Sequence, residues 1–188
     1  MTEEPMGDVC PPSAVRWLNT RLRKLVQNPA RVFGDYVNSG DTVADLGCGG
    51  GYFAVALAEM VGENGRVIAV DVQAEMLDIT RGGAANKGVT DRITFHKCEP
   101  DDIGLVGEKV DFALAFYMVH EVPNRKAFFN QVAVLLKPEA RFLIIEPTFH
   151  VSSSQFERIL DEADSAGLKS IEAVKVLLSR GMLFTGNK

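Results

Sequence analysis

The segment from Asp45 to Phe53, Asp-Leu-Gly-Cys-Gly-Gly-Gly-Tyr-Phe, constrains this chain more than any other. The apolar run over 42–46 predicts a buried strand, and the apolar periodicity over 52–61 predicts a helix. Glycine tolerates a positive φ and lets a ligand approach the backbone, so the glycines between these elements predict a tight turn. Because the first N–H groups of a helix have no intrahelical partners, such a turn is typical of a nucleotide-binding site.

Strand and helix patterns alternate through the rest of the sequence. Apolar runs separated by amphipathic helix patterns are typical of a parallel sheet that helices cover on both faces. We therefore expect an α/β fold with a Rossmann-like, doubly wound sheet of seven strands that is mostly parallel. The apolar runs predict strands at residues 42–46, 66–70, 93–96, 110–116, 141–145, 168–174 and 183–184.

The last two of these strands are joined by a short segment. Residues 175–182 carry no amphipathic helix pattern of useful length. A parallel pair needs a connection of about a dozen residues or more, so strands joined this closely are normally antiparallel. The sheet is therefore expected to end in a C-terminal antiparallel hairpin, which a plain dinucleotide-binding fold lacks.

Local signals predict where several helices begin. One helix is expected over 73–81. Pro123 suits the first turn of a second helix, and the core side of that helix would include Leu136. Ser154 and Glu157 have capping-box spacing and predict the start of a third helix.

The 188 residues are 46% hydrophobic and 24% charged, as expected for one globular domain. Residues 1–12 are acidic and contain prolines, so we expect a disordered tail there. Residues 13–188 are expected to form a single domain. The mostly helical pattern of 13–38 predicts an N-terminal lid over a core at 39–188, and a packed helix without a chemical role is the alternative.

Charge and cysteine content indicate which ligands and which cellular compartment this protein is expected to have. The net charge of −5 argues against general binding to nucleic acid. The basic cluster Arg16, Arg21, Arg23 and Lys24 is interpreted as a solvated helix face, with an RNA contact as the alternative. The three cysteines are widely spaced and form no CxxC pair, which favours reduced thiols in a cytoplasmic protein without a metal site. No apolar stretch is long enough to cross a bilayer.

Asp71 ends the second predicted strand and can accept hydrogen bonds from both hydroxyls of a ribose. The alternative is a solvated acid that caps the next helix. A glycine turn followed by an acid fits both NAD and S-adenosylmethionine. Four features favour the latter: Asp45 before the first glycine, the spacing GxGxG with Tyr52 following, the acids at 99, 101 and 102, and the closing hairpin.

Together these residues resemble the class I S-adenosylmethionine-dependent methyltransferases. More narrowly, they resemble the small single-domain group that includes the ubiquinone- and menaquinone-pathway methyltransferases. The resemblance runs from about Pro29 to the C-terminus and implies S-adenosylmethionine as the cofactor. The matching segments are Asp45–Gly51, Asp71, 73–77, 98–102, 111–116, 135–138 and 142–147.

The resemblance also implies roles in the cofactor site. Gly47 and Gly49 would approach the methionine part, and Asp45 would orient the loop or meet the cofactor's amino group. Glu99 would accept a hydrogen bond from the adenine amino group, and Phe116 would offer its backbone carbonyl beside the methionine ammonium. The implied cofactor-binding residues are Asp45, Gly47, Cys48, Gly49, Gly51, Asp71, Val72, Met76, Glu99 and Phe116.

The sequence departs from this family in three places. Pro100 stands where many members donate a backbone N–H to the adenine ring. Proline has no N–H, so this contact must be absent or supplied by Asp101. Glu99 is longer than the usual aspartate. Glu139-Ala140 replaces a glycine pair before the fifth strand, so that turn must take another shape or carry strain.

Residues after the fourth strand are candidates for the acceptor side, because ligands of open α/β sheets bind at the carboxyl ends of strands. Methyl transfer is an in-line displacement, and it needs a base only if the acceptor must lose a proton. His120 is the first candidate base; alternatively, a hydrogen bond to a neighbour such as Glu146 lets it fix the loop. His150 is a second candidate. Tyr117 is a further catalytic candidate, expected to line the pocket with Glu121.

We expect an enzyme that methylates a small molecule, because neither an inserted substrate domain nor an extended basic surface is visible. The alternatives are methylation of a protein or RNA, and a cofactor-binding module without catalysis. An NAD(P)-linked oxidoreductase would need GxGxxG and a hydride-transfer site, and neither is found. A thiol-dependent arsenite methyltransferase could use Cys48 and Cys98, but small buried thiols explain both. A homodimer is considered as an assembly state.

Overall fold

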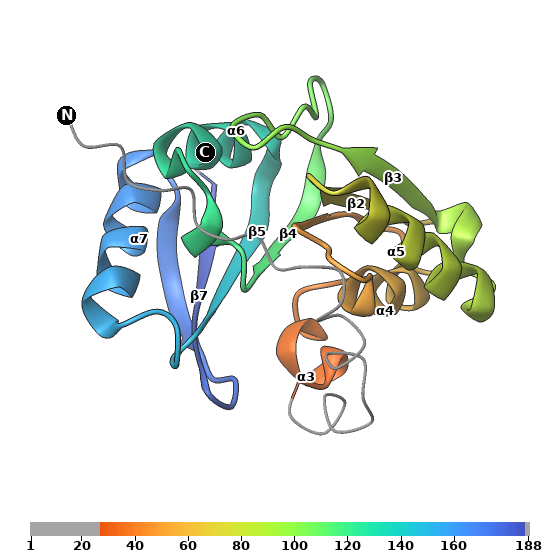
Figure 1. The fold of residues 1–188 in the computed structure, drawn as a ribbon, viewed down its shortest axis with the longest axis horizontal. Helices are drawn as coiled ribbons and strands as arrows, with labels where there is room; N and C mark the ends of the chain where they lie inside the picture. Colours follow the sequence, from red (N-terminus) through yellow and green to blue (C-terminus); the bar gives the residue numbers. More distant parts are fainter. Residues whose placement is uncertain (1–26, 187–188) are drawn as a thin grey trace.

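The computed structural model describes residues 27–186, which form a sheet flanked by helices (Figure 1). The strands are β1 (Thr42–Leu46), β2 (Arg66–Asp71), β3 (Ile93–Lys97), β4 (Val110–Phe116), β5 (Leu136–Pro147), β6 (Lys169–Val174) and β7 (Ser179–Thr185). They form one seven-stranded sheet in the order β3-β2-β1-β4-β5-β7-β6. Strands β1 to β5 are parallel, and β7 is antiparallel to both β5 and β6. The predicted sheet and its C-terminal hairpin are confirmed.

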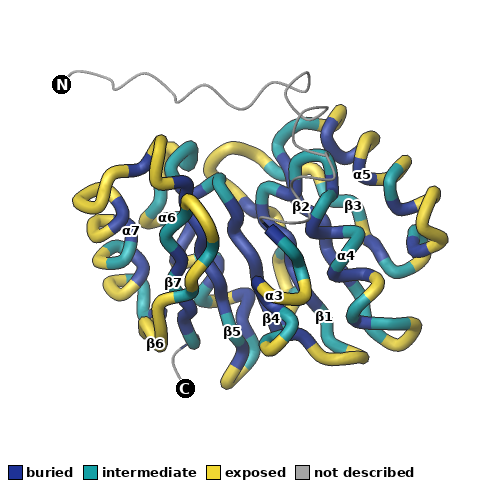
Figure 2. The backbone as a smooth tube through the Cα atoms, turned by 90° about the horizontal axis from the view of Figure 1, so that it is seen from below, coloured by how far each residue is buried: buried dark blue, intermediate teal, exposed yellow. Residues whose placement is uncertain are grey.

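Helices cover both faces of this sheet. One face carries α3 (Pro29–Phe33), α4 (Tyr52–Val61) and α5 (Ala74–Lys87), and the other carries α6 (Arg125–Leu135) and α7 (Ser153–Ser165). Successive residues of a strand point to opposite faces, so Phe112 and Leu114 of β4 pack with the first group and Ala113 and Ala115 with the second. Figure 2 shows the strands buried between helices whose outer faces are exposed.

Several elements are longer than predicted; β7, for example, begins at Ser179 rather than at residue 183, where it continues the antiparallel pairing with β5. The helix expected over 73–81 continues to Lys87, because Ala84 is buried against the sheet and outweighs the low helix propensity of the two preceding glycines. Strand β5 begins at Leu136, which was expected to lie on the preceding helix. Glu139 within it has a φ of 64°, a left-handed conformation that strains a residue with a Cβ. The sequence left open whether this turn takes another shape or carries strain, and the positive φ of Glu139 corresponds to the second.

Two predicted helix starts were wrong by a few residues. Helix α6 begins at Arg125, and Asn124 caps it by accepting a hydrogen bond from the Ala127 N–H, so Pro123 precedes the helix. The capping box of α7 is formed by Ser152 and Gln155, whose side chains each accept the other's backbone N–H at 3.3 and 2.8 Å. Ser154, which was predicted as the cap, lies inside the helix because the chain turns two residues earlier.

The predicted tail and most of the predicted lid lie outside the described residues. Of the segment 13–38, the structure describes the part from Gln27 onward, where Asn28 caps α3 by accepting the Ala30 N–H at 3.0 Å. Within the described range, no helix has the length and apolar character needed to cross a membrane.

Candidate functional site

A cavity of about 570 Å³ lies at the carboxyl ends of the central strands. Its wall is formed by the turn after β1, the end of β2, the loop after β3, and the segments that follow β4 and β5. Every cofactor-binding residue implied by the sequence lines this cavity except Gly51. The acceptor-side candidates line it as well: Tyr117, His120, Glu121 and His150.

The glycine turn presents its backbone to the cavity at Gly49. This residue has a φ of 51°, and a Cβ added to it would meet no atom within 4 Å. Gly51 has a different role, because its Cβ would lie 2.5 Å from the Thr80 side chain of α5. Gly49 therefore leaves space for a ligand, whereas Gly51 allows the close packing of α4 against α5.

Asp71 joins the glycine turn to the end of β2. Its carboxylate accepts the Gly49 N–H at 2.8 Å through Oδ2 and the Gln73 N–H at 2.9 Å through Oδ1. Burial raises the pKa of this carboxyl, and the backbone N–H groups around it oppose that rise. The Asp71 carboxylate lies in the cavity wall beside Gly49, which has free space next to it, and a carboxylate there can accept hydrogen bonds from ribose hydroxyls. These groups therefore fit the adenosyl part of S-adenosylmethionine.

The thiols of Cys48 and Cys98, which lie near this turn, favour the protonated form. Cys48 is buried with its sulfur 3.9 Å from the Thr80 hydroxyl, and burial raises its pKa well above the usual value. Burial also raises the pKa of Cys98 to about 11. A protonated thiol is a poor nucleophile and metal ligand, so both cysteines suit a packing role in the cavity wall.

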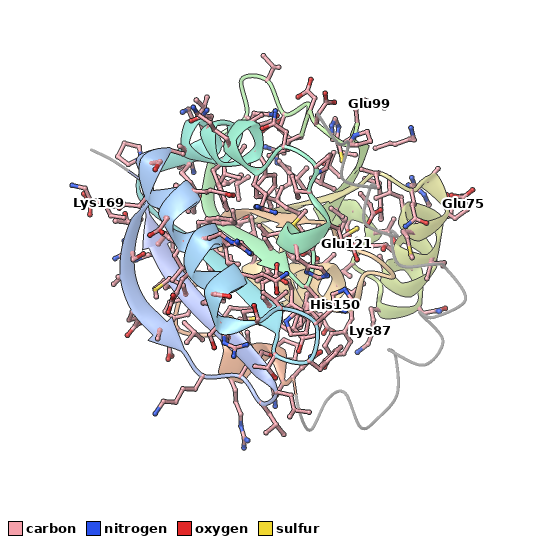
Figure 3. All side chains as sticks on the ribbon, turned by 60° about the vertical axis from the view of Figure 1, so that its left-hand side comes forward. Glu75, Lys87, Glu99, Glu121, His150 and Lys169 are labelled. Carbon is pink, nitrogen blue, oxygen red and sulfur yellow. The ribbon has the colours of Figure 1, made fainter. Side chains whose placement is uncertain are left out.

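Glu99 lies at the rim of the cavity. Its side chain is 71% exposed, with a carboxylate oxygen 3.7 Å from the Lys97 ammonium. Figure 3 shows Glu99 at the edge of the molecule, away from Glu121 and His150. Among the implied cofactor residues, Glu99 is thus exposed to solvent, whereas Asp45 at the end of β1 is only 2% exposed.

His120 and Glu146 form a close pair in the opposite wall. His120 lies in the short helix η3 (Val119–Glu121), and Glu146 is fully buried near the end of β5. The two Glu146 oxygens accept from His120 Nδ1 at 2.5 Å and from the His120 backbone N–H at 3.2 Å. Because a carboxylate accepts the hydrogen of Nδ1, Nε2 is the basic ring nitrogen of His120.

The surroundings of His120 favour its protonated form. Burial by itself lowers the pKa of the imidazole, but the hydrogen bond and charge of Glu146 and the charge of Glu121 outweigh burial and raise it. Glu121 lies 3.8 Å from Nε2, and the His150 ring lies 5.0 Å from the His120 ring. The sequence offered two interpretations of His120. The structure shows the hydrogen bond to Glu146 and places His120 in the cavity wall, and its role as a base stays a prediction.

The Tyr117 hydroxyl forms hydrogen bonds within the protein. The residue has a φ of 61°, and its hydroxyl accepts from Gln27 Nε2 at 3.1 Å and lies 2.5 Å from the Ser179 hydroxyl. Gln27 and Gln131 also line the cavity, and neither was predicted from the sequence. No motif surrounds them, and only the fold brings them to this wall.

A family described as a methyltransferase domain matches residues 37–179. A match over this much of the chain shows that the protein belongs to that family. Curated relatives include the ubiquinone/menaquinone biosynthesis C-methyltransferases UbiE of Pseudomonas putida F1, 27% identical over 124 residues, and of Haemophilus ducreyi, 26% identical over 110. These alignments cover 64% and 58% of this chain but only 48% and 42% of the relatives, so the chain spans about half their length.

Solved structures agree with this assignment. A SAM-dependent methyltransferase from Aquifex aeolicus is 28% identical, with a TM-score of 0.84 over 94% of this chain and 98% of that one. A putative rRNA methylase from Clostridium thermocellum has a TM-score of 0.68 over 86% of this chain and 96% of its own; at 18% identity, this likeness shows the fold alone. The chain thus belongs to the methyltransferase-domain family and resembles the S-adenosylmethionine-dependent methyltransferases of the UbiE group.

Proposed function

We propose that the protein transfers the methyl group of S-adenosylmethionine to a small, uncharged acceptor that binds beside His120. The observation that carries this proposal is the His120–Glu146 pair in the wall of the cavity that the glycine turn also lines. An acceptor with an O–H, N–H or acidic C–H group requires a base close to the cofactor site to take its proton.

On this proposal, the two walls of the cavity have separate tasks. S-adenosylmethionine supplies an electrophilic methyl group when it is bound. Asp71 and the turn at Gly49 hold the adenosyl part, and Asp45 stabilises the cationic methionine end. The enclosing wall keeps the acceptor in line with the methyl group, and such orientation contributes on the order of 7–11 kcal/mol in favourable cases.

His120 takes the acceptor's proton. Nε2 would receive the proton as the bond from the acceptor atom to the methyl group forms and the bond from that methyl group to sulfur breaks, which leaves S-adenosylhomocysteine. Glu146 keeps its hydrogen bond to Nδ1–H throughout. The resulting imidazolium is stabilised by the Glu146 and Glu121 carboxylates. Release of the proton to water then restores the neutral histidine.

The charge of the cavity supports an uncharged acceptor. Six acidic residues line it, and none of the described lining residues is lysine or arginine: Asp45, Asp71, Glu99, Asp101, Asp102 and Glu121. A phosphate or carboxylate on the acceptor would therefore meet mostly like charges, and among the described lining residues only a protonated histidine could oppose them. This favours a small neutral molecule over RNA. Methylation of RNA or protein is kept as an alternative, and the homodimer and cytoplasmic location stay predictions.

The test is turnover with methyl-labelled S-adenosylmethionine and a defined panel. The panel contains neutral phenols, demethylated quinols and amines, and each neutral compound is matched with a carboxylated or phosphorylated analogue. Total RNA and unfolded protein complete the panel. We expect label in neutral members only, and much less with His120→Asn. Label in RNA or protein, or a preference for the anionic partners, would contradict the proposal.

A further inference from the structure

Three consecutive residues, 178–180, lie where the hairpin turn enters β7. In the sheet, Ser179 lies opposite Pro147 and Arg180 lies opposite Glu146, so this stretch borders the carboxyl end of β5 (Figure 1). None of the three residues lines the cavity. Each of them, however, is hydrogen-bonded to a segment that contributes side chains to the cavity wall.

The connection between β5 and α7 is held at both of its ends by this stretch. The Leu178 carbonyl accepts from the Thr148 N–H and from the Thr148 hydroxyl, each at 3.0 Å. The Arg180 guanidinium donates to the Val151 carbonyl and to the Ser153 hydroxyl, each at 2.8 Å. These four bonds fix the connection relative to β7.

Phe149 and His150 lie between the two held ends and line the cavity. Both are exposed, so packing against the core does not fix them. The Phe149 ring lies 6.5 Å from the Tyr117 ring, and the His150 ring lies 5.0 Å from that of His120. Backbone bonds to the Pro147 carbonyl shape this turn locally. Its position beside the candidate base therefore depends on the bonds to residues 178–180.

The segment after β4 is bonded to the same stretch through Ser179. Gln27 Nε2 donates to the Tyr117 hydroxyl at 3.1 Å, which leaves the Tyr117 O–H to donate to Ser179 Oγ, 2.5 Å away. The Ser179 hydroxyl donates to the Leu177 carbonyl at 3.2 Å. Each hydroxyl of this chain thus has an acceptor for its hydrogen.

Two residues with strained backbones meet at this junction. Tyr117 has a φ of 61° and Leu178 a φ of 58°. In the range 27–186, Glu139 is the one further residue other than glycine with a positive φ. Bulky residues keep this conformation only where the surrounding structure holds them, and such positions cluster at functional sites.

We propose that Ser179 and Arg180 are positioning residues that set the places of Tyr117, Phe149 and His150, and thereby determine which acceptors fit. This inference rests on the proposed function, because it takes these three side chains to contact the acceptor. Orientation contributes to the rate only when the reacting groups are held in place. Among the described residues, no hydrogen bond of Ser179 or Arg180 reaches the glycine turn or the end of β2, so cofactor affinity should not depend on them.

The kinetic test uses two neutral compounds of different size that the labelled panel shows to be methylated. Arg180→Met removes the donors of the side chain and nearly keeps its length. It should raise the acceptor KM about threefold to tenfold, as expected for lost hydrogen bonds, and change the ratio of kcat/KM between the two compounds. Calorimetric affinity for S-adenosylhomocysteine should stay within about twofold. A mere loss of folded protein would lower kcat and leave KM and the ratio unchanged.

Matched variants separate positioning from general effects. Arg141→Met is the control, because Arg141 of β5 also donates to a backbone carbonyl, that of Glu139 at 3.0 Å, at the opposite end of the sheet. It should behave like the wild type, and Arg180→Lys should recover part of the lost acceptor affinity. Ser179→Ala removes the bond to Tyr117 and should also change the ratio, whereas Ser179→Thr keeps the hydroxyl and should restore it. If Arg180→Met does not fold, the two Ser179 variants decide.

A second test needs no acceptor. The chain contains three histidines, so their ring resonances can be followed by NMR in protein labelled at histidine. In Arg180→Met the resonances of His150 should move, because the connection that carries it is released. Those of His96 should not move, since His96 lies on β3 with Nε2 3.0 Å from the Ile103 carbonyl, far from β7 in the sheet.

Three results would overturn this inference. The first is an unchanged His150 spectrum in folded Arg180→Met, and the second is wild-type KM and selectivity in both Arg180→Met and Ser179→Ala. The third is an equal loss of acceptor and cofactor affinity, which indicates a general structural role. If no compound in the panel is methylated, the proposed function itself fails. The histidine resonances then still show whether Arg180 positions this segment.

Discussion

The two walls of the cavity are built in different ways. One wall, formed by the glycine turn and the end of β2, is proposed to hold the cofactor and is called the cofactor wall. Here Asp71 accepts a hydrogen bond from Gly49, which is 22 positions away and lies after the neighbouring strand. The opposite wall, formed by the segments after β4 and β5, is proposed to hold the acceptor and is called the acceptor wall. Here the Tyr117 hydroxyl contacts Gln27 and Ser179, which are 90 and 62 positions away. The first wall uses backbone groups from one strand-turn-helix unit and its neighbour, whereas the second uses side chains from distant parts of the chain.

On the proposed function, this difference separates the task of binding the cofactor from that of binding the acceptor. A turn made of backbone N–H groups binds the same cofactor whatever the acceptor is, because its geometry depends on glycine conformation and strand pairing. The acceptor wall depends on side-chain identity, so it can change while the cofactor wall stays the same. We therefore expect cofactor affinity and turnover to respond independently to substitutions.

The largest expected effect is a loss of turnover when the acceptor wall is changed. His120→Asn keeps an amide donor for the buried Glu146 but removes the basic nitrogen. Turnover of an accepted substrate should fall by about 10²–10⁴-fold, the usual contribution of a general base, while the affinity for S-adenosylhomocysteine changes less than about twofold. Steady-state kinetics and calorimetry measure the two quantities.

His150→Asn is the matched control, because His150 also lines the cavity and its ring lies 5.0 Å from that of His120. It should retain turnover within about threefold of the wild type. If the two variants lose turnover equally, or if His120→Asn remains fully active, His120 is not the base.

The next effect tests the cofactor wall. Asp71→Ala removes an acceptor that holds Gly49 and Gln73 and would also hold the ribose hydroxyls. Because hydrogen bonds to a charged group each contribute about 1.5–3 kcal/mol, affinity for S-adenosylhomocysteine should fall at least about a hundredfold. Asp71→Asn, which keeps one acceptor oxygen, should lose less. Unchanged calorimetric affinity in Asp71→Ala would show that the cofactor site is misplaced.

The smallest effect concerns pH. The base must be neutral to act, and Glu146 raises the pKa of His120 by stabilising the imidazolium, so wild-type kcat should rise with pH through a pKa above the usual value of about 6.5. Glu146→Gln removes that charge, so the pKa falls and the acidic limb of the profile moves to lower pH. The plateau should drop about tenfold as Nδ1–H loses its charged acceptor.

The pH profiles of kcat for the wild type and Glu146→Gln measure this shift directly. A shift to higher pH, or none, would show that Glu146 does not control the protonation of His120. Binding of S-adenosylhomocysteine should be the same in both proteins, since Glu146 is outside the cofactor wall.

Much of the fold was predictable because its signals are local. Apolar runs and the glycine turn located the strands of the core, and the short connection before β7 predicted the antiparallel hairpin. Helix starts were less predictable: Ser152 and Ser154 are equally suitable caps by composition, and the position where the chain leaves β5 decided between them. The extent of α5 past its glycines likewise depended on the burial of Ala84.

By itself the sequence determined the glycine turn, the acid at the end of β2 and the cofactor class, because neighbouring residues encode backbone geometry. The tertiary structure decided which side chains meet across the cavity. Glu146 is hydrogen-bonded to His120, and Gln131 to the Asp101 carbonyl, because strand order and helix packing bring these residues together. No sequence motif contains either pair.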